Sequence, residues 1–380
     1  MTRPSSPECL AETARLAFHF HWPLDTILDL EHRDRRQFLA EAGYDEARRQ
    51  HMAGDASTRS YARLFRDEAG VILMNSPRRP DGPPIYDGKS YSAAAHLAED
   101  VKPFVAIAGG LRQRGFSAPA IHYADLDAGF LITEDFGSVG VIEGDPPRPI
   151  GERYQAATDM LAALHRLPLP AILPLTPHTS YTIPLFDTDA LLVEIGLMLE
   201  WYLPERDATP AEPLRAALVT MWRELLDKAT AGPNTWALRD FHSPNLIWLD
   251  DRADIAKVGI IDFQDTVLAP AAYDLVSLLQ DARVDVPEQL ELVLLTRYMK
   301  ARLASDGNFD PAHFAELYAI MSAQRNTKLL GIFARLNQRD GKPQYLRHLP
   351  RIWTYLNRSL AHPALAPLQE WYAANVPPPS

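Results

Sequence analysis

Cysteine is nearly absent from this sequence, since Cys9 is the only one among 380 residues. A single cysteine excludes a disulfide within the chain and any metal site made of several cysteines. The scattered histidines show no metal-ligand spacing either. This composition fits a reducing compartment, and we expect the protein to be cytoplasmic.

Long hydrophobic runs are also missing. The longest apolar stretch near the start, residues 16–22, is interrupted by His19 and His21. A membrane-spanning helix needs about 20 apolar residues, and a signal peptide has a basic segment before its apolar one. We therefore expect neither kind of segment and no membrane partner.

Basic residues are in the minority, with 38 Lys and Arg against 49 Asp and Glu and a formal net charge of −11. Nucleic acids are bound through clustered Lys and Arg. We therefore expect no nucleic-acid partner, although a local basic pocket could still bind an anionic small molecule.

The length and the order of the elements predict two lobes. A chain of 380 residues exceeds what one hydrophobic core usually serves. Two apolar segments around residues 67–70 predict a β-hairpin, a helix follows at 96–114, and further strand candidates cover 120–123 and 130–133.

The rest of the chain is mostly helical in pattern. The predicted helices cover residues 154–167, 189–203, 213–229, 273–281, 287–303, 313–337 and 345–360. We therefore expect an α+β, bilobal fold with a small antiparallel sheet in the N-terminal lobe and a mostly helical C-terminal lobe. Ligands usually bind in the cleft of such an arrangement.

Three oxygen-bearing side chains stand out in the second half. Asp240 and Asn245 lie five residues apart on a loop that runs into an apolar strand, and Asp262 ends the next strand. A hairpin of residues 245–249 and 258–262 would hold Asn245 and Asp262 at neighbouring strand ends. Such oxygen ligands suit Mg²⁺.

These residue types match the needs of phosphoryl transfer, which are a cation, positioned phosphates and a carboxylate that orients the attacking hydroxyl. Acids on loops also cap helices and turns. The loop with Asp240 and Asn245 alone, or Asp262 at its strand end alone, would favour that role. Both halves together, after a strand-rich lobe, predict a magnesium-dependent kinase of a small molecule.

The same segment resembles the aminoglycoside phosphotransferase and choline kinase superfamily, which shares the protein-kinase-like fold. The superfamily pattern is His-Gly-Asp, four residues, Asn, and later Ile-Asp-[Phe/Trp]. The resemblance implies that Asp240 is the catalytic aspartate and that Asn245 and Asp262 bind the metal. The chain has Leu238 and Arg239 at the His-Gly positions, so the support of the catalytic loop must differ.

A narrower resemblance covers most of residues 32–370. The segments LITEDFG, LRDFHSPNLIWL, GIIDFQDTVLAPAAYDLVSLLQDAR and QRNTKLLGIFARLNQRDGKPQYLRHLPRIW are similar to the anomeric N-acetylmuramate/N-acetylglucosamine kinases of peptidoglycan recycling, which phosphorylate the C1 hydroxyl with ATP. The resemblance implies ATP and Mg²⁺ as cofactors and an amino-sugar substrate. Residues 1–31 fall outside the resemblance, and we expect them to form a helical extension. With the lobe boundary at the loop after residue 137, we expect a nucleotide-binding lobe over 32–137 and a catalytic, substrate-binding lobe over 138–380.

Nucleotide contacts are expected from two segments of the N-terminal lobe. Residues 54–64 sit where kinases place a glycine-rich loop, but they contain no G-x-G-x-x-G and offer hydroxyls and arginines instead. The connector at 134–137 would bind the adenine edge through its backbone. An ordinary hairpin edge is the competing interpretation of the first segment. The predicted contacts are Ser57, Thr58, Arg59, Glu134 and Phe136.

The next strand lacks the lysine that kinases pair with a helix glutamate. Met74 takes its place, and residues 102–112 of the following helix carry no acid. The absence of both the strand lysine and the helix glutamate is reasonable, because a buried carboxylate without its partner is costly. Another cation must then hold the phosphates, with Arg59 as the first candidate and Lys89 as the second.

Sugar recognition is expected from the helical lobe. Gln264 and Asp265 directly follow the metal-binding acid. Glu194 and Trp201 share one helix face, opposite an apolar stripe, and Trp201 could stack on a sugar ring or fill the core.

Arg325 lies on the apolar stripe of the helix over 313–337. A cation on a buried face must be paired or must serve a ligand. An ion pair with an acid such as Asp274 or Asp281 therefore competes with recognition of the lactyl carboxylate of N-acetylmuramate.

Two other functions stay open at this point. A superfamily kinase of choline, an aminoglycoside or another sugar would need an acidic, aromatic pocket for a cationic substrate, which Glu194 and Trp201 favour and Arg325 opposes. A nucleotide-binding pseudokinase is suggested by the missing lysine and opposed by the complete set of Asp240, Asn245 and Asp262.

Overall fold

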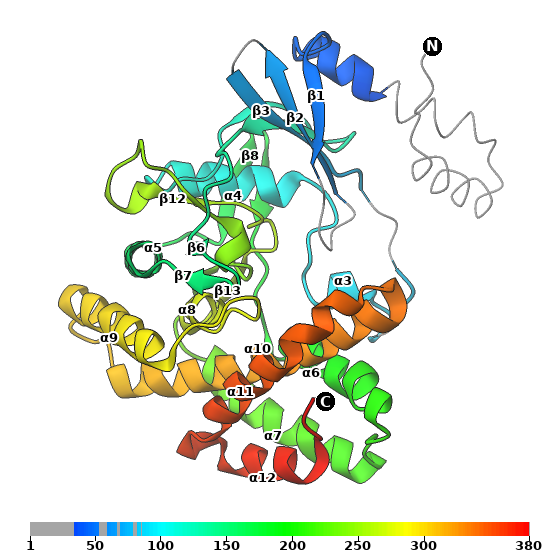
Figure 1. Cartoon of the computed structure of the whole chain (residues 1–380), viewed down its shortest axis with the longest axis vertical. Coiled ribbons are helices and arrows are strands. Elements are labelled where there is room, and N and C mark those ends of the chain that lie inside the picture. The colour runs from blue at the N-terminus through cyan, green and yellow to red at the C-terminus, as the bar shows by residue number, and fades with distance from the viewer. Residues whose placement is uncertain (1–33, 53–58, 67–68, 79–81, 85, 380) are drawn as a thin grey trace, which may run out of the picture. The chain divides into compact units, whose positions relative to one another are not determined.

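The computed structural model describes residues 34–52, 59–66, 69–78, 82–84 and 86–379 (Figure 1). They fall into two compact units. The sheet unit holds the described residues before 79 together with residues 121–135, and the helical unit holds those of 80–120 and 136–379. The helix after the first three strands, which we expected in the N-terminal lobe, is therefore grouped with the helical unit.

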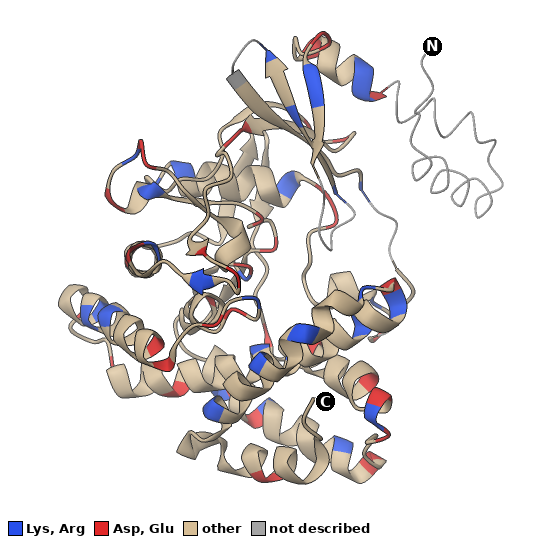
Figure 2. Ribbon diagram, in the orientation of Figure 1, with Lys and Arg blue, Asp and Glu red and all other residues tan. Residues whose placement is uncertain are grey.

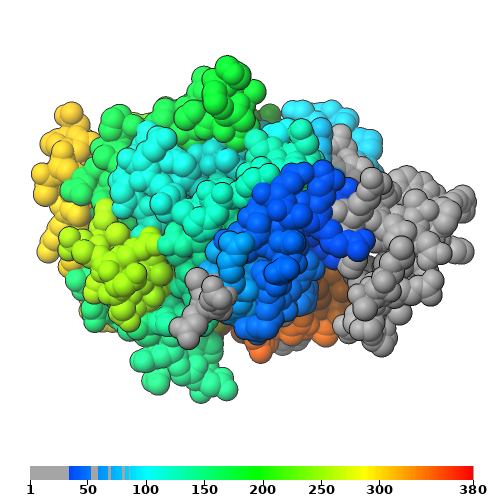
Figure 3. All heavy atoms as spheres, turned by 90° about the horizontal axis from the view of Figure 1, so that it is seen from above, coloured from blue at the N-terminus to red at the C-terminus, as the bar shows by residue number. Residues whose placement is uncertain are grey.

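The sheet unit is a five-stranded antiparallel sheet with the order β1-β2-β3-β5-β4. Its strands are β1 (Arg48–Met52), β2 (Ser60–Arg66), β3 (Ala69–Asn75), β4 (Ile121–Asp125) and β5 (Phe130–Glu134). The predicted hairpin around residues 67–70 is confirmed, since Phe65 lies opposite Gly70 and Ser60 opposite Asn75. In the space-filling view, the first strands and the preceding helix form the blue surface (Figure 3).

One face of this sheet is covered by a helix over residues 34–41. Phe38 and Leu39 of that helix pack against Leu64 and Leu73 in a buried apolar cluster. Side chains alternate between the two faces of a strand, so Met74 points to the opposite face from Leu73. Met74 is 2% exposed, and its position is thus filled by a buried apolar side chain.

The helical unit confirms the expected helical character of the second part. Its helices are α3 (Tyr91–Ala94), α4 (Lys102–Arg112), α5 (Gly151–Leu164), α6 (Thr188–Leu197), α7 (Glu212–Thr230), α8 (Ala272–Leu279), α9 (Glu288–Ser305), α10 (Pro311–Asp340), α11 (Leu349–Leu360) and α12 (Ala366–Asn375). A π-helical turn, Met198–Tyr202, continues α6. None of the described helices is long and apolar enough to cross a membrane.

Short antiparallel strand pairs connect these helices. They are β6 (Ile142–Glu143) with β7 (Arg148–Pro149), β8 (Ile172–Thr176) with β9 (Thr179–Thr182), β10 (Thr235–Ala237) with β13 (Val267–Ala269), and β11 (Leu246–Trp248) with β12 (Val258–Ile260). The last of these pairs carries two of the residues singled out from the sequence.

The long helix α10 organises the helical unit because it packs against α6, α8 and α11. Its start is fixed by Asp310, whose side chain accepts from the Ala312 amide at 2.8 Å, and its end by Gly341 in the left-handed conformation. At Gly331 a Cβ atom would lie 2.3 Å from the carbonyl carbon of Leu197. Glycine there lets the backbones of α10 and α6 approach closely.

Candidate active site

The hairpin of β11 and β12 brings Asn245 and Asp262 to one end of the strand pair. Leu246 lies opposite Ile260, and the Ile261 amide donates to the Asn245 carbonyl at 3.0 Å. Asn245 directly precedes β11, and Asp262 follows β12 by two residues. The hairpin predicted from the sequence is confirmed.

The loop that carries Asp240 is tied to the same end of the hairpin. Asn245 Nδ2 donates to the Asp240 carbonyl at 3.0 Å, and the His242 amide donates to the same oxygen at 3.0 Å. Asn245 thus contacts both the Asp240 backbone and the strand that leads to Asp262. The structure brings these three predicted residues together.

The Asp240 carboxylate remains accessible, with 36% of its side chain exposed, and two basic side chains lie close to it. His242 Nε2 lies 3.6 Å and an Arg325 guanidinium nitrogen 3.9 Å from Asp240 Oδ1. Burial alone would raise the pKa of this carboxyl group. The hydrogen bond and charge of His242, followed by Arg325 and Lys328, overcome that effect and hold the Asp240 pKa well below its usual range.

Asn245 and Asp262 offer the amide and carboxylate oxygens that suit a hard divalent cation. Gln264 Nε2 donates to Asp262 Oδ1 at 3.0 Å and thereby orients the carboxylate. Among the described residues no three His, Cys, Asp or Glu side chains gather as a metal site. A cation held by Asn245 and Asp262 would therefore take its other ligands from water and substrate phosphates, as Mg²⁺ commonly does.

Two buried acids support the Asp240 loop through its backbone. Asp274 accepts the Leu238 amide at 2.6 Å and the Arg239 amide at 2.9 Å. Asp281 accepts the Ser243 amide at 3.0 Å. Neither anchoring role was predicted from the sequence, since the amides that Asp274 and Asp281 bind lie 35 to 38 residues away.

Arg239, next to Asp240, was also missed as a functional candidate. It adopts a left-handed backbone conformation with φ +65°, and its side chain is 2% exposed. The guanidinium contacts Glu194 Oε1 at 2.5 Å and donates to the Ala95 carbonyl at 2.8 Å. The sequence signal was its occurrence at a position where the superfamily pattern has glycine.

The position of Glu194 opposite the apolar stripe of its helix had suggested an open face, but the structure buries this side chain. It is 0% exposed, and besides Arg239 it contacts Lys328 Nζ at 2.7 Å. The Gln324 side-chain amide donates to its other oxygen at 3.2 Å. Glu194 thus lies beneath the Asp240 loop within a group of buried cations.

Arg325 is buried, with a side chain 6% exposed, and it lies within ion-pair distance of Asp240, 3.9 Å away, and not of Asp274 or Asp281. It also donates to the Arg239 carbonyl at 3.2 Å. Its Nε atom is buried and has no hydrogen-bond partner among the described residues. Arg325 is therefore held beside Asp240 while one of its donors stays unused.

The remaining sugar candidates lie in different surroundings. Gln264 is buried beside Asp262, and Asp265 accepts the Ala98 amide at 2.6 Å. Trp201 is half-buried in the π-helical turn, where its carbonyl accepts from Gln338 of α10. The structure thus gathers Gln264 with Asp262, whereas Trp201 occupies a separate helical segment.

The predicted nucleotide contacts are spread over several segments. Ser57 and Thr58 lie outside the described residues. Arg59 directly precedes β2, and Glu134 ends β5 opposite Val71. Phe136 packs over Gly259 of β12, with the Arg252 guanidinium 5.0 Å from its ring centroid.

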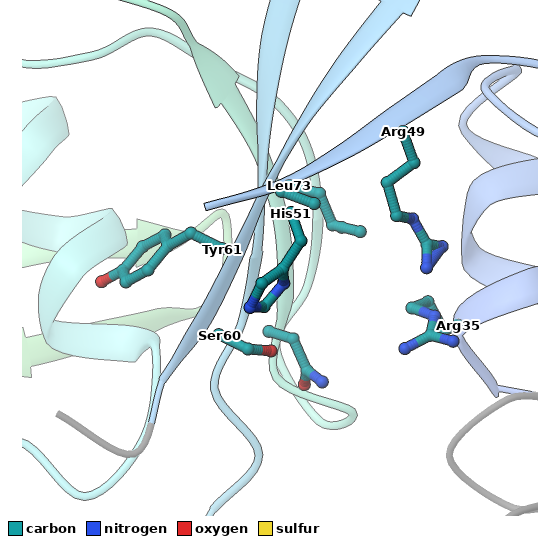
Figure 4. Close-up of a pocket in the computed structure, with 8 residues that line it drawn as sticks. Arg35, Arg49, His51, Ser60, Tyr61 and Leu73 are labelled. Atoms are coloured by element: carbon teal, nitrogen blue, oxygen red, sulfur yellow. The ribbon is translucent and has the colours of Figure 1, made fainter. Parts of the chain in front are cut away.

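The sheet unit also contains a small cavity beside the first three strands (Figure 4). Arg35 and Arg49 lie on one side of it, and burial together with the nearby Arg35 charge lowers the Arg49 pKa. The cavity volume is about 50 Å³, whereas small-molecule sites usually measure several hundred Å³. This cavity is too small to hold a nucleotide.

Comparisons with known proteins agree with the motifs. Residues 49–317 match the phosphotransferase enzyme family. An N-acetylmuramate/N-acetylglucosamine kinase of Caulobacter vibrioides is 39% identical over 355 residues, which cover 90% of this chain and 95% of that protein. A protein of the same name from Pseudomonas aeruginosa is 30% identical over 347 residues, covering 89% and 92%.

The fold is found among solved structures as well. The GDP complex of wild-type aminoglycoside 2'-phosphotransferase-IIIa superimposes with a TM-score of 0.52 and 13% sequence identity. The match covers 86% of this chain and 98% of that chain. At this level of identity the similarity concerns the fold.

Proposed function

This chain belongs to the phosphotransferase enzyme family, and we propose that it transfers the γ-phosphoryl group of ATP to the anomeric C1 hydroxyl of N-acetylmuramate, N-acetylglucosamine or both. The joining of Asp240, Asn245 and Asp262 at one hairpin end carries this proposal. The acceptor follows from the names of the two relatives, which the chain matches over nearly its whole length. A role in peptidoglycan recycling is part of the same proposal.

Asp240 is the proposed base of the reaction. Its low pKa keeps the carboxylate ionised at neutral pH, so it accepts a hydrogen bond from the C1 hydroxyl and takes its proton during transfer. A weak base suffices because an anomeric hydroxyl is more acidic than an ordinary alcohol. The accessible part of the Asp240 side chain leaves room for the acceptor.

Asn245 and Asp262 are the proposed ligands of Mg²⁺, which would neutralise phosphate charge when bound. Gln264 keeps the Asp262 carboxylate oriented. For the nucleotide we propose Ser57, Thr58 and Arg59 near the phosphates. The GDP complex of a protein with the same fold supports nucleotide use.

The connector residues Glu134 and Phe136 are proposed to border the adenine base. Gln264, Asp265 and Trp201 remain the proposed sugar contacts. For N-acetylmuramate we propose that the unused Nε donor of Arg325 serves the lactyl carboxylate. N-acetylglucosamine lacks that group, so loss of Arg325 should affect N-acetylmuramate more.

A cationic acceptor such as choline is disfavoured by the charges around Glu194. This carboxylate, the acid that such a pocket would need, already contacts Arg239 and Lys328. Arg325 adds a third cation close to Asp240.

The proposal is tested by ATP turnover with N-acetylmuramate, N-acetylglucosamine and choline supplied separately, with and without Mg²⁺. We expect turnover with an amino sugar and Mg²⁺ only, and phosphate on C1 by NMR of the product. Absence of sugar-dependent turnover would contradict the function, and phosphate on another hydroxyl would contradict the anomeric position.

Replacement of Asp240 by Asn tests the catalytic role. We expect kcat to fall by about 10² to 10⁴-fold, while binding of ATP, measured by calorimetry, stays close to wild type. Asp251→Asn, at an exposed position in the turn after β11, is the control and should leave kcat unchanged. Near-normal turnover of Asp240→Asn would refute the assignment.

A further inference from the structure

The backbone conformation of Arg239 is unusual for its residue type. Its φ of +65° lies in the left-handed region, which a residue with a Cβ atom adopts only reluctantly and glycine adopts freely. Such conformations persist where the surroundings determine them. The side chain of Arg239 must therefore contribute contacts that glycine cannot provide.

The Arg239 guanidinium joins three segments of the helical unit. It bonds Glu194 of α6 at 2.5 Å and the carbonyls of Ala95 and His96, after α3, at 2.8 and 3.3 Å. It also lies 4.6 Å from the ring centroid of Phe186, just before α6. Arginine suits such a site because its planar fork presents donors in fixed directions.

The charge of Glu194 is balanced from a second side. Lys328 of α10 contacts Glu194 Oε1 at 2.7 Å, so one buried carboxylate serves two buried cations. The long helix that carries Lys328 has several basic residues along its length (Figure 2). Without Arg239, Glu194 and Lys328 would still form a balanced pair.

The contacts of Lys328 lead back to the Asp240 loop. Lys328 Nζ donates to the Tyr273 hydroxyl at 3.4 Å, and Arg325 approaches the same hydroxyl at 3.5 Å. Arg325 in turn donates to the Arg239 carbonyl, which also accepts from Ser277 at 3.0 Å. Both the side chain and the carbonyl of Arg239 are thus fixed.

We propose that Arg239 is a positioning residue for phosphoryl transfer, whose guanidinium, clamped by Glu194 and the carbonyls of Ala95 and His96, sets the loop that presents Asp240. Glu194 acts through Arg239 and does not touch the sugar. This inference rests on the proposed kinase function. Loss of this clamp should therefore lower the rate of phosphoryl transfer, in which Asp240 takes part, more than the affinity for either substrate.

The test is Arg239→Gly in the full-length chain. Glycine accepts the left-handed backbone, and the pair of Glu194 and Lys328 remains balanced, so the variant should fold. We expect kcat to fall at least tenfold, with KM for ATP and for the amino sugar within about twofold of wild type. A kcat within twofold of wild type would overturn the proposal.

Asp207→Gly is the matched control, because Asp207 is another left-handed residue, φ +52°, at an exposed position of the helical unit. It should leave kcat and both KM values unchanged. Arg239→Lys keeps the charge opposite Glu194 and should recover part of the kcat lost in Arg239→Gly. Lack of any recovery would refute the clamp by Glu194.

If Arg239→Gly fails to fold, the double variant Glu194→Gln with Lys328→Met replaces it. It preserves the sum of the buried charges but removes the carboxylate from Arg239, so kcat should again fall at least tenfold. Wild-type kcat in this variant would overturn the proposal. If the wild type itself shows no sugar-dependent ATP turnover, the proposed function fails instead, which separates the two outcomes.

Discussion

The sheet unit and the helical unit each hold ion pairs, but in different surroundings. In the sheet unit Arg63 contacts Asp135 through two nitrogens, and these side chains are 24% and 13% exposed. In the helical unit Glu194 is 0% exposed between Arg239 at 2% and Lys328 at 9%. Water can replace a lost partner in the first case and cannot do so in the second.

The two kinds of ion pair therefore contribute differently to the stability of the fold. A partly exposed pair adds little to stability, because water solvates both charges in the unfolded chain as well. A buried group has lost that solvation, so removing the one carboxylate that its cations share is costly. Glu194 pairs with Arg239, the chain neighbour of Asp240, so the unit with the predicted catalytic residue is also the one most sensitive to loss of this carboxylate.

The largest effect on stability is expected for Glu194→Gln. It leaves Arg239 and Lys328 buried without their shared carboxylate, which should lower the free energy of unfolding by about 3 to 5 kcal/mol. Urea unfolding followed by tryptophan fluorescence reports on this unit, since six of the seven tryptophans lie between residues 201 and 371.

The control for this variant is Asp189→Asn on the same helix. Asp189 pairs with Arg223, and their side chains are 76% and 48% exposed. Its replacement should change the free energy of unfolding by no more than about 0.5 kcal/mol. Equal losses for Glu194→Gln and Asp189→Asn would remove the distinction between buried and exposed pairs.

A smaller but sharper effect is expected in a double-mutant cycle of Glu194→Gln and Lys328→Met. Lys328→Met alone leaves Arg239 paired with Glu194, and the double variant restores the sum of charges. The double variant should therefore be more stable than the sum of the single losses predicts, by about 2 to 3 kcal/mol. A coupling energy near zero would show that Lys328 and Glu194 act independently.

The sequence predicted the parts of the site that depend on local order. The hairpin that joins Asn245 to Asp262 was foreseen because turn residues separate two short apolar strands, and the match to relatives confirms the resemblance drawn from the motifs. The strands around residues 67–70 were foreseen on the same grounds. Each of these features involves residues that are near neighbours along the chain.

Contacts between distant segments were not foreseen. Glu194 was placed opposite the apolar stripe of its helix, but α10 packs on that face and brings Lys328 against it. Helical periodicity identifies one buried face and cannot show that a second helix covers the other. Arg239 and Glu194 are 45 residues apart, so only the folded chain reveals their pairing.

Two elements differ locally from what the sequence indicated. The hairpin of β8 and β9 was not predicted; Pro174 lies within β8, and proline is unfavourable inside a strand. The helix predicted over 189–203 ends at Leu197 and continues as a π-helical turn. The close approach of Gly331 to Leu197 lies at this change of pitch, which no pattern in the segment itself could show.

The stability of the helical unit should also depend on pH. In the helical unit, burial and the nearby charge of Arg302 lower the His165 pKa to about 3, and His165 Nδ1 bonds the Tyr298 hydroxyl at 2.8 Å. Below pH 6.5 the His165 imidazole takes up a proton in the unfolded chain, whereas in the folded chain it stays neutral down to about pH 3. Stability is therefore complete above pH 6.5 and is lost as the pH falls towards 3.

Between pH 7 and pH 5 this loss amounts to about 2 kcal/mol. His165→Gln should flatten the dependence of unfolding free energy on pH in this range, as measured by urea unfolding at several pH values. His178→Gln, at an exposed position, is the control and should leave the slope unchanged. An unaltered slope in His165→Gln would show that other groups cause the pH dependence.

The smallest effect is expected for Asp135→Asn in the sheet unit. Arg63 stays partly solvated when its partner is lost, so the amides of β2 and β3 should lose no more than about 1 kcal/mol of protection in hydrogen exchange. High salt should shrink the difference from wild type, because ions screen partly exposed charges. A loss above about 2 kcal/mol that salt does not change would mean that the pair of Arg63 and Asp135 behaves as a buried one. The contrast between the two units would then lie in the number of charges gathered and no longer in their exposure to water.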